Sequence, residues 1–297
     1  MSNQPAQPKR SRLDPVLWSS LMLVLGFFLL FSYLAPKVAE YVETNQIPLE
    51  QMQIQIVPIL IYFFSAVVIL GIVLFIIPVR FLKYVLRAVF AVLYTWGIVI
   101  ICGLVLPGWP SIAIGAVIAI VWLIWPLLWL QNVLLLLTLT SVGAVFGVLI
   151  SPWTVVWVLV ALSIYDVVAV RFGYMMWMAR KLSQSDTLPA FILPRQNRLW
   201  GNNLKGSSVQ KIFDSESSER DFSLLGGGDL GFPLIFTASV YAGFGFQGAL
   251  VVALSCLVGL LFAYALQIWV LKGKPLPALP PISFVAIIGF LIVRYIM

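Results

Sequence analysis

Long hydrophobic runs separated by short polar breaks occupy most of this 297-residue chain. A helix that crosses a hydrocarbon layer of about 30 Å needs about 20 apolar residues. The pattern therefore predicts an all-α polytopic membrane protein with nine transmembrane helices. They cover about Val16–Ala35, Ile56–Val79, Tyr84–Leu106, Ser111–Leu130, Val133–Ile150, Trp153–Met178, Phe222–Phe246, Ala249–Leu271 and Pro277–Met297.

The polar segments divide the chain into three parts. Residues 1–178 contain the first six helices, 179–221 form one long polar segment, and 222–297 contain the last three. The Gly, Ser and Asn content of the long segment predicts a mobile loop. Most Lys and Arg residues fall on the side of the N-terminus when successive connections alternate between the two faces. The positive-inside rule then predicts a cytoplasmic N-terminus and loop, an outside C-terminus, and a multi-pass protein of the cell membrane.

The amino-acid composition excludes several kinds of catalytic site. The chain is 62% hydrophobic and 10% charged, and it has no histidine and two cysteines. Without histidine, Ser-His and Cys-His nucleophile systems and His-ligated metals are excluded. Cys102 and Cys256 lie in different hydrophobic runs at no metal or redox spacing, which is typical of buried packing residues. We therefore expect no metal and no cofactor. The distribution of the net charge of +7 indicates membrane topology and not a nucleic acid partner.

Two aspartates interrupt the hydrophobic runs. Asp166 ends the sequence Ser-Ile-Tyr-Asp in the sixth run, and Asp229 ends Gly-Gly-Gly-Asp in the seventh. An ionised Asp at the centre of a membrane helix costs about 2.5–3.5 kcal/mol on insertion scales, so such a residue is expected to have a function. Counted at 1.5 Å per residue, both fall about 10 Å from the cytoplasmic face. The equal depths predict that the two carboxyl groups share one site.

A pair of carboxyl groups can hydrolyse a peptide bond without a metal or a covalent intermediate. Two Asp side chains within a few ångström share a proton, because both cannot ionise cheaply. The ionised member takes a proton from water while the neutral member hydrogen-bonds the scissile carbonyl. We therefore predict that Asp166 and Asp229 are catalytic. Which of them is protonated is a property of the pair and is not assigned by the sequence.

The residues around the aspartates fit this chemistry. The three glycines before Asp229 remove side-chain bulk and permit close backbone approach. A substrate helix in lipid has all its peptide groups bonded internally, so it must unwind before water attacks. Pro277, Pro280 and Pro281 interrupt regular helix, and the irregular backbone there could hold an extended substrate strand by β-type hydrogen bonds.

Each signal also has a simpler explanation. A buried Asp in a membrane helix can also bind or relay protons or cations. A proton- or cation-coupled transporter or channel that uses Asp166 and Asp229 is therefore the alternative function. Tyr165 is more often a packing residue, and glycine runs and proline-rich breaks are more often bends and boundaries. A transporter favours an internal repeat, and none is seen here. A non-catalytic membrane scaffold would leave the buried pair unexplained.

Three motifs together resemble the presenilin and signal-peptide-peptidase family of intramembrane aspartyl proteases. They are Tyr-Asp at 165–166, Gly-x-Gly-Asp at 226–229 and Pro-Ala-Leu at 277–279. The short loops are most similar to an archaeal presenilin homologue, and the predicted orientation resembles presenilin and is opposite to that of signal peptide peptidases. Prepilin peptidases also carry Gly-x-Gly-Asp, but the nine helices and Pro-Ala-Leu argue against that type.

The resemblance implies roles for individual residues. It implies that Asp166 and Asp229 form the catalytic pair of an endopeptidase. The residues that it implies to shape the active site are Tyr165, Gly226 and Gly228, and those that it implies to contact substrate are Gly227, Pro277, Ala278 and Leu279. Animal presenilins carry a larger apolar residue at the position of Gly227, which predicts a different substrate preference.

The resemblance also implies partners. The expected substrates are single-span transmembrane proteins in the lipid bilayer, with no obligatory accessory subunit, and a homo-oligomer is compatible with the sequence. The segment 179–221 lacks the long hydrophilic insertion of animal presenilins, so activating self-cleavage in this loop is left open.

Overall fold

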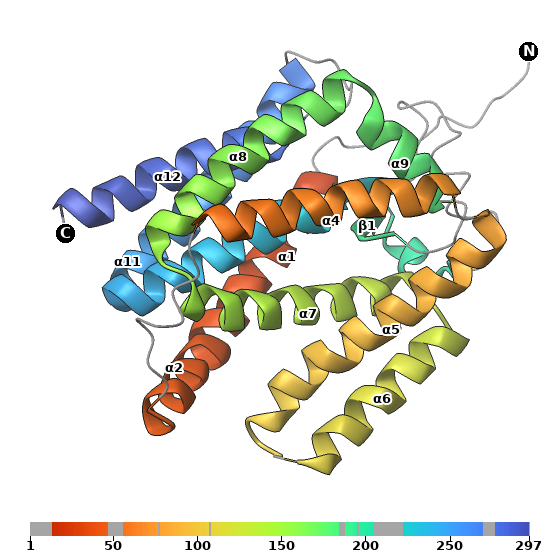
Figure 1. Cartoon of the computed structure of the whole chain (residues 1–297), viewed down its shortest axis with the longest axis horizontal. Coiled ribbons are helices and arrows are strands. Elements are labelled where there is room, and N and C mark those ends of the chain that lie inside the picture. The colour runs from red at the N-terminus through yellow and green to blue at the C-terminus, as the bar shows by residue number, and fades with distance from the viewer. Residues whose placement is uncertain are drawn as a thin grey trace, which may run out of the picture.

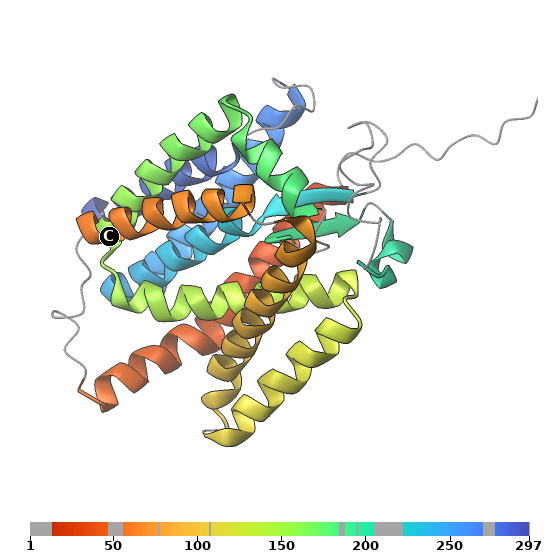
Figure 2. The same cartoon turned by 45° about the vertical axis from the view of Figure 1, so that its right-hand side comes forward.

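A computed structural model describes residues 14–46, 56–76, 78–106, 108–183, 188–194, 196–204, 222–269 and 277–296. These residues form a helical protein with one small sheet (Figures 1 and 2). The elements are α1 (Asp14–Leu29), a π-helical turn η1 (Leu30–Leu34), α2 (Ala35–Thr44), α4 (Ile56–Ile76), α5 (Val79–Gly103), α6 (Trp109–Ile124), α7 (Leu128–Leu149), α8 (Pro152–Arg171), α9 (Tyr174–Ser183), β1 (Ala190–Pro194), a 3-10 turn η2 (Asn197–Gly201), β2 (Phe222–Gly226), α11 (Gly227–Trp269) and α12 (Leu279–Ile296).

Six helices of the described part are long and apolar enough to cross a membrane. They are Val16–Thr44, Phe81–Gly103, Leu128–Leu149, Pro152–Arg171, Gly227–Trp269 and Leu279–Ile296. The 43-residue α11 contains two helices that meet at Gly245, whose φ of 72° favours glycine. The chain is therefore a multi-pass integral membrane protein.

The first helix is longer than the sequence predicts. We expect it to end at Ala35 because Pro36 follows, yet the chain stays helical to Thr44. Proline lacks an N–H and its ring collides with the preceding turn of a regular helix. Here the π-helical turn precedes it, and Ala35 N–H bonds the Leu30 carbonyl five residues back. This wider turn accommodates Pro36 without ending the helix.

The break between the fourth and fifth helices lies elsewhere than predicted. We place it at Gln131-Asn132, on the polarity of these two residues, but α6 ends at Ile124 and α7 begins at Leu128. Pro126 explains the difference, because the residue before a proline is driven out of the helical region. Trp125 accordingly has φ −124° and ψ 78°. Gln131 and Asn132 thus lie within α7, where they are buried.

The predicted seventh helix and the predicted loop also differ from the structure. The first five residues of the predicted helix form strand β2, and α11 begins only at Gly227. Within 179–221, residues 190–194 form β1 and residues 197–201 form η2, whereas residues 205–221 lie outside the described part. The two strands pair antiparallel, with Ile192 opposite Leu224. The sheet lies at the end of the molecule away from the C-terminus (Figures 1 and 2).

Helix α7 is the centre of the fold. It packs against α11, α5 and α1, and two of its glycines make the contact with α11 close. A Cβ on Gly147 would lie 2.8 Å from the carbonyl oxygen of Ile235, and one on Gly143 would lie 3.1 Å from Leu234. Small residues let membrane helices approach in this way, where lipid supplies little hydrophobic driving force.

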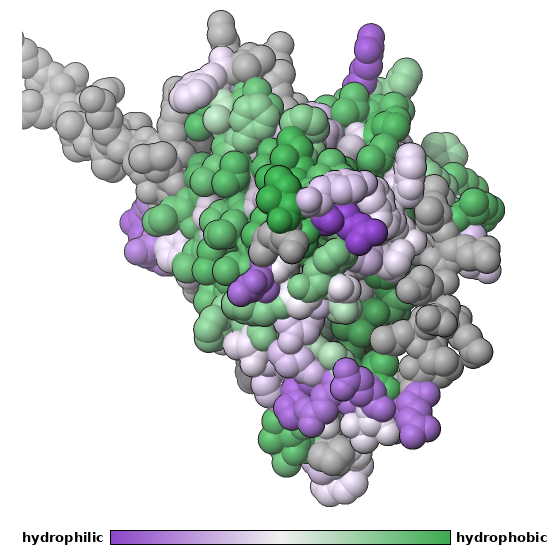
Figure 3. Space-filling view, turned by 90° about the vertical axis from the view of Figure 1, so that its left-hand side faces the viewer, coloured by the Kyte–Doolittle hydropathy of each residue, from purple (hydrophilic) through white to green (hydrophobic). Residues whose placement is uncertain are grey.

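Helix α12 lies against α11 and α8 (Figure 1). Its contact with α11 depends on Gly259, where an added Cβ would lie 2.7 Å from the Cα of Ile282. Figure 3 views the side of the molecule on which the C-terminus lies in Figure 1, and hydrophilic side chains gather at its lower edge and in patches among hydrophobic ones. Many large hydrophobic side chains of α4, α5 and α6 are exposed, which suits a protein whose helices face lipid.

We predict that Gly259→Ala lowers the free energy of unfolding by about 1–3 kcal/mol, because the added methyl group overpacks the start of α12. Denaturation in detergent micelles, followed by tryptophan fluorescence, measures the change. The control is Gly103→Ala, where the nearest atom to the new Cβ is the Ser111 hydroxyl oxygen at 3.8 Å. Equal stability of the two variants would contradict the predicted close contact.

Candidate active site

Asp166 lies in the last two turns of α8 and is the first residue of the sequence Asp-Val-Val-Ala-Val-Arg that ends the helix. Its carboxylate Oδ2 accepts a hydrogen bond of 3.3 Å from the backbone N–H of Leu279, the first residue of α12. The N–H groups of a first helical turn lack partners within their own helix. A carboxylate from a different helix therefore satisfies one of them, and this bond joins the Tyr-Asp and Pro-Ala-Leu motifs.

Asp229 lies in the first turn of α11, directly after β2. The backbone of Gly226, the last residue of β2, hydrogen-bonds its carboxyl group. A Cβ on Gly226 would lie 3.0 Å from Asp229 Oδ2, closer than most real contacts of a Cβ atom. A larger residue at 226 would therefore displace the carboxyl group. The strand-to-helix junction fixes the position of Asp229.

The carboxyl groups of Asp166 and Asp229 are close enough to interact electrostatically. They come from α8 and α11, which are also in contact. We expect equal depth from a continuous helix over 222–229, but the strand rises about 3.3 Å per residue where a helix rises 1.5 Å. The helical count that led us to predict equal depth is therefore wrong for this segment, and the shared site stays a prediction supported by the contact between α8 and α11.

The remaining motif residues take different positions. Leu279 is buried with Val158, Leu162 and Phe232, whereas Pro277 and Ala278 are half-buried. Gly227 is buried, and a Cβ there would lie 3.0 Å from the Pro189 carbonyl oxygen.

Gly228 differs from the other two motif glycines because it is exposed, and a Cβ there would make only ordinary contact with the Phe232 ring at 3.6 Å. Of the three glycines, Gly228 therefore leaves its backbone open beside Asp229. Gly227, for which the family resemblance implies substrate contact, is instead buried.

Tyr165 points toward α4. Its ring packs edge-to-face on Phe64 at 6.2 Å between centroids. It also lines an apolar groove with residues of α4 and with Tyr174 of α9. Tyr165 is thus a packing residue between α8 and α4 that lies next to Asp166 in the chain.

The sheet beside Asp229 has a regular hydrogen-bond pattern. Residues of an antiparallel pair alternate between those whose N–H and C=O face the partner strand and those whose groups face away. Gly227 N–H donates to the Pro189 carbonyl at 2.9 Å, which continues the pairing one residue past the strands. In this alternation the backbone groups of Gly226 and Leu224 face the outer edge of β2.

Gln131 and Asn132 of α7 hold the other strand. Asn132 Nδ2 donates to the Ile192 carbonyl at 2.8 Å, and Ile192 N–H donates to Asn132 Oδ1 at 3.0 Å. Gln131 Nε2 donates to the Leu188 carbonyl at 3.0 Å, and Trp122 Nε1 donates to Gln131 Oε1 at 2.9 Å. The sequence does not reveal the role of Gln131 and Asn132, because their polarity indicates a loop. Two adjacent amides in an otherwise apolar run are the signal that could have found them.

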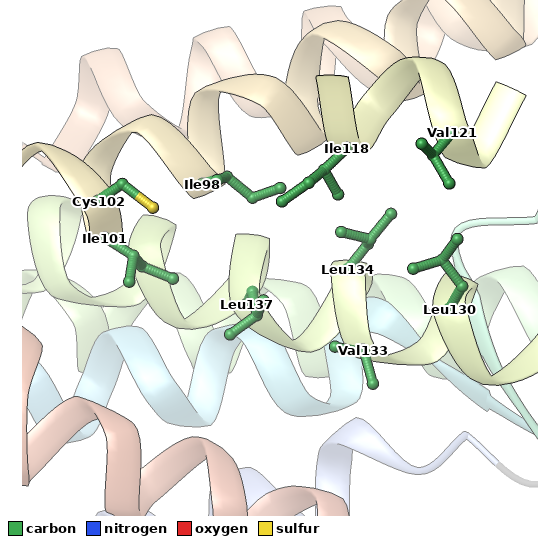
Figure 4. A pocket seen from close by; sticks show the side chains of 9 residues that line it. All are labelled: Ile98, Ile101, Cys102, Ile118, Val121, Leu130, Val133, Leu134 and Leu137. Atoms are coloured by element: carbon green, nitrogen blue, oxygen red, sulfur yellow. The ribbon is translucent and has the colours of Figure 1, made fainter. Parts of the chain in front are cut away.

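A cavity of about 390 Å³ lies away from this site, between α7 and the α5–α6 hairpin (Figure 4). Nine residues line it, and the thiol of Cys102 is the only side-chain group among them that is not hydrocarbon. No carboxyl group is among the residues that line this cavity, so it is not the candidate active site. Within the described ranges, no group of three or more His, Cys, Asp or Glu side chains could hold a metal ion.

Comparison with known proteins agrees with the motifs. A family model described as signal-peptide peptidase, presenilin aspartyl protease matches residues 25–296. Among solved structures, a presenilin family intramembrane aspartate protease in space group C222 is 20% identical and has a TM-score of 0.61, covering 95% of this chain and 100% of that chain. A second, in space group P2, is also 20% identical, with a TM-score of 0.58 and coverage of 95% and 98%. No curated protein matches the chain.

The solved structures show the presenilin fold, and the family model spans nearly all of the described helices. The transporter alternative finds no support in these matches. The resemblance predicted from the three motifs is confirmed. The chain belongs to the signal-peptide peptidase and presenilin family of aspartyl proteases, and it is an intramembrane aspartyl protease.

Proposed function

We propose that Asp166 and Asp229 are the catalytic pair that hydrolyses a peptide bond of a substrate helix within the bilayer. The observation that carries this proposal is the meeting of the three motifs, in which Leu279 N–H bonds Asp166 and the charge of Asp166 acts on Asp229. The ionised carboxylate takes a proton from water, and the neutral acid hydrogen-bonds the scissile carbonyl oxygen. The water oxygen bonds to the carbonyl carbon, and the C–N bond breaks as its nitrogen gains a proton.

The backbone donors prepare the pair for this step. Leu279 N–H and the Gly226 backbone each hold one carboxyl group in place. Because the donors belong to the backbone, their orientation is fixed by the fold and does not need to be reached during the reaction. The exposed Gly228 lets the substrate backbone come close to Asp229.

The substrate binds as an extended strand on the outer edge of β2. A helix in lipid satisfies its own backbone groups, so unwinding leaves N–H and C=O groups that need new partners. The outward groups of Leu224 supply them by β-augmentation. The next outward position is Gly226, which adjoins Asp229, so this register brings the substrate peptide to the carboxyl pair. The half-buried Pro277 and Ala278 lie next to Leu279 and form the opposite wall.

The chain crosses the cell membrane nine times, with the N-terminus and 179–221 in the cytoplasm and the C-terminus outside. Two observations support the count: α11 holds two helices that meet at Gly245, and α4 and α6 are apolar. The distribution of Lys and Arg supports the orientation. Single-span transmembrane proteins are the substrates, and the chain acts without an obligatory accessory subunit.

Replacing either catalytic carboxyl group with an amide should abolish hydrolysis. We expect Asp166→Asn and Asp229→Asn each to lower kcat by about 1,000-fold or more, because an amide neither accepts nor supplies the proton. The measurement is cleavage of a fluorescent single-span peptide by purified protein in detergent. The control is Glu43→Gln on the exposed end of α2. Hydrolysis that survives either substitution would refute the catalytic pair.

A methyl group at position 226 should disturb catalysis through Asp229. We expect Gly226→Ala to lower kcat by about 10–100-fold, because its Cβ occupies the space of the Asp229 carboxyl oxygen. Gly243→Ala on the same helix is the matched control, since its Cβ would lie an ordinary 3.6 Å from Pro152 Cγ. The same kinetic assay with both variants measures the effect. Unchanged kcat in Gly226→Ala would show that the close approach does not matter.

Orientation can be tested with an impermeant thiol reagent on intact cells. In a background of Cys102→Ala and Cys256→Ala, the variant Trp109→Cys should be labelled from outside, whereas Arg198→Cys should be labelled only after the membrane is opened. Both positions are exposed in the structure. The reverse pattern would show that the chain has the opposite orientation.

A further inference from the structure

The outer edge of β1 is occupied by a side chain. Asn132 bonds both backbone groups of Ile192, at 2.8 Å and 3.0 Å, as a neighbouring strand would. We propose that Asn132 is a positioning residue that closes this edge, directs the substrate strand to β2, and thereby sets which peptide bond is cleaved. The proposal rests on the proposed proteolytic function and deepens it.

The register of the sheet determines which backbone groups face its two outer edges. Ile192 lies opposite Leu224, so both residues have the same orientation toward the partner strand. Since both groups of Ile192 bond Asn132, they face away from β2, and the groups of Leu224 face away from β1. The Gly227–Pro189 bond falls at an inward-facing position of the same alternation. The sheet therefore has one edge closed by Asn132 and one edge, that of β2, next to Asp229.

The side-chain amide of Asn132 is buried. Asn132 is 0% exposed, and its Nδ2 and Oδ1 atoms each bond Ile192. An unpaired strand edge is a template for any extended chain. Without Asn132, the N–H and C=O of the buried Ile192 would lack these partners, and β1 would lose the bonds that hold it against α7. A buried amide that pairs both groups therefore keeps this edge closed and fixes the position of β1.

Helix α7, which carries Asn132, packs against α11, which carries Asp229. The same helix contacts α11 through Gly143 and Gly147, and its Leu139 lies within 4 Å of the Cβ positions of Gly227 and Gly231. Asn132 thus ties β1 to the helix against which the Asp229-bearing helix is packed. Since a slip of one residue reverses the faces of a strand, this tie sets the register in which substrate meets the carboxyl pair.

The test compares the masses of the cleavage products of one single-span peptide. We expect Asn132→Leu, which keeps the shape but makes neither bond, to lower kcat by about 10-fold and to spread cleavage over neighbouring peptide bonds. Hydrogen exchange measured on the segment 188–194 should be faster, because Ile192 N–H loses its bond to Asn132 Oδ1.

The matched control is Thr140→Val. Thr140 is also fully buried on α7, but its hydroxyl bonds only the Leu136 carbonyl of its own helix. This variant should give the wild-type products whatever its stability, so a shift in cleavage position is not a mere consequence of a weaker fold. If Asn132→Leu does not fold, Asn132→Asp, which keeps the acceptor and loses the donor, takes its place in the comparison.

The outcomes separate the two proposals. A folded, active Asn132 variant with the wild-type cleavage position and wild-type exchange at 188–194 would overturn the positioning role while leaving the protease assignment intact. Wild-type cleavage that persists in Asp166→Asn or Asp229→Asn would instead overturn the catalytic pair itself. Altered products in Asn132→Leu together with wild-type products in Thr140→Val would establish the positioning role.

Discussion

A backbone that leaves the helix inside a membrane protein must find partners for its N–H and C=O groups within the protein. Each unpaired group in hydrocarbon costs several kcal/mol. The structure leaves regular helix at the β1–β2 sheet and at the start of α12, and there side chains or other backbone groups provide partners. Asn132 and Gln131 serve β1, the Pro189 carbonyl serves Gly227, and Asp166 serves Leu279. The active site that we propose lies between these segments.

This arrangement gives the irregular segments two uses at once. An extended backbone beside the catalytic pair can exchange hydrogen bonds with an unwound substrate, which a helix cannot do. The same segments are held by buried polar groups whose loss would leave a donor or acceptor unpaired, at a cost of about 1–3 kcal/mol each. Stability and substrate binding therefore depend on the same few atoms.

The sequence predicts the family, the chemistry and most helices, and its errors have a common cause. Asp166 and Asp229 stand out because a carboxyl group in an apolar run is expensive. Strand β2 does not, because Phe222 to Leu225 reads as the apolar start of a helix. Gln131 and Asn132 read as a loop, because composition does not reveal that β1 pairs with them. Pro36 reads as a helix end, because the π-helical turn that accommodates it has no clear sequence signal. In each case the structure is determined by a residue distant in the chain or by a backbone geometry, and neither can be read from the local sequence.

The bond between Leu279 and Asp166 makes the carboxyl group that we propose as catalytic a capping group for the first turn of another helix. An ionised carboxylate is a stronger acceptor for a backbone N–H than the neutral acid. Each proton that Asp166 gains or loses during turnover therefore changes how firmly the first turn of α12 is held. By thermodynamic reciprocity, anything that a substrate does to the Pro-Ala-Leu segment must in turn change proton binding at Asp166. Substrate binding at the Pro-Ala-Leu segment and proton binding at Asp166 are then thermodynamically coupled.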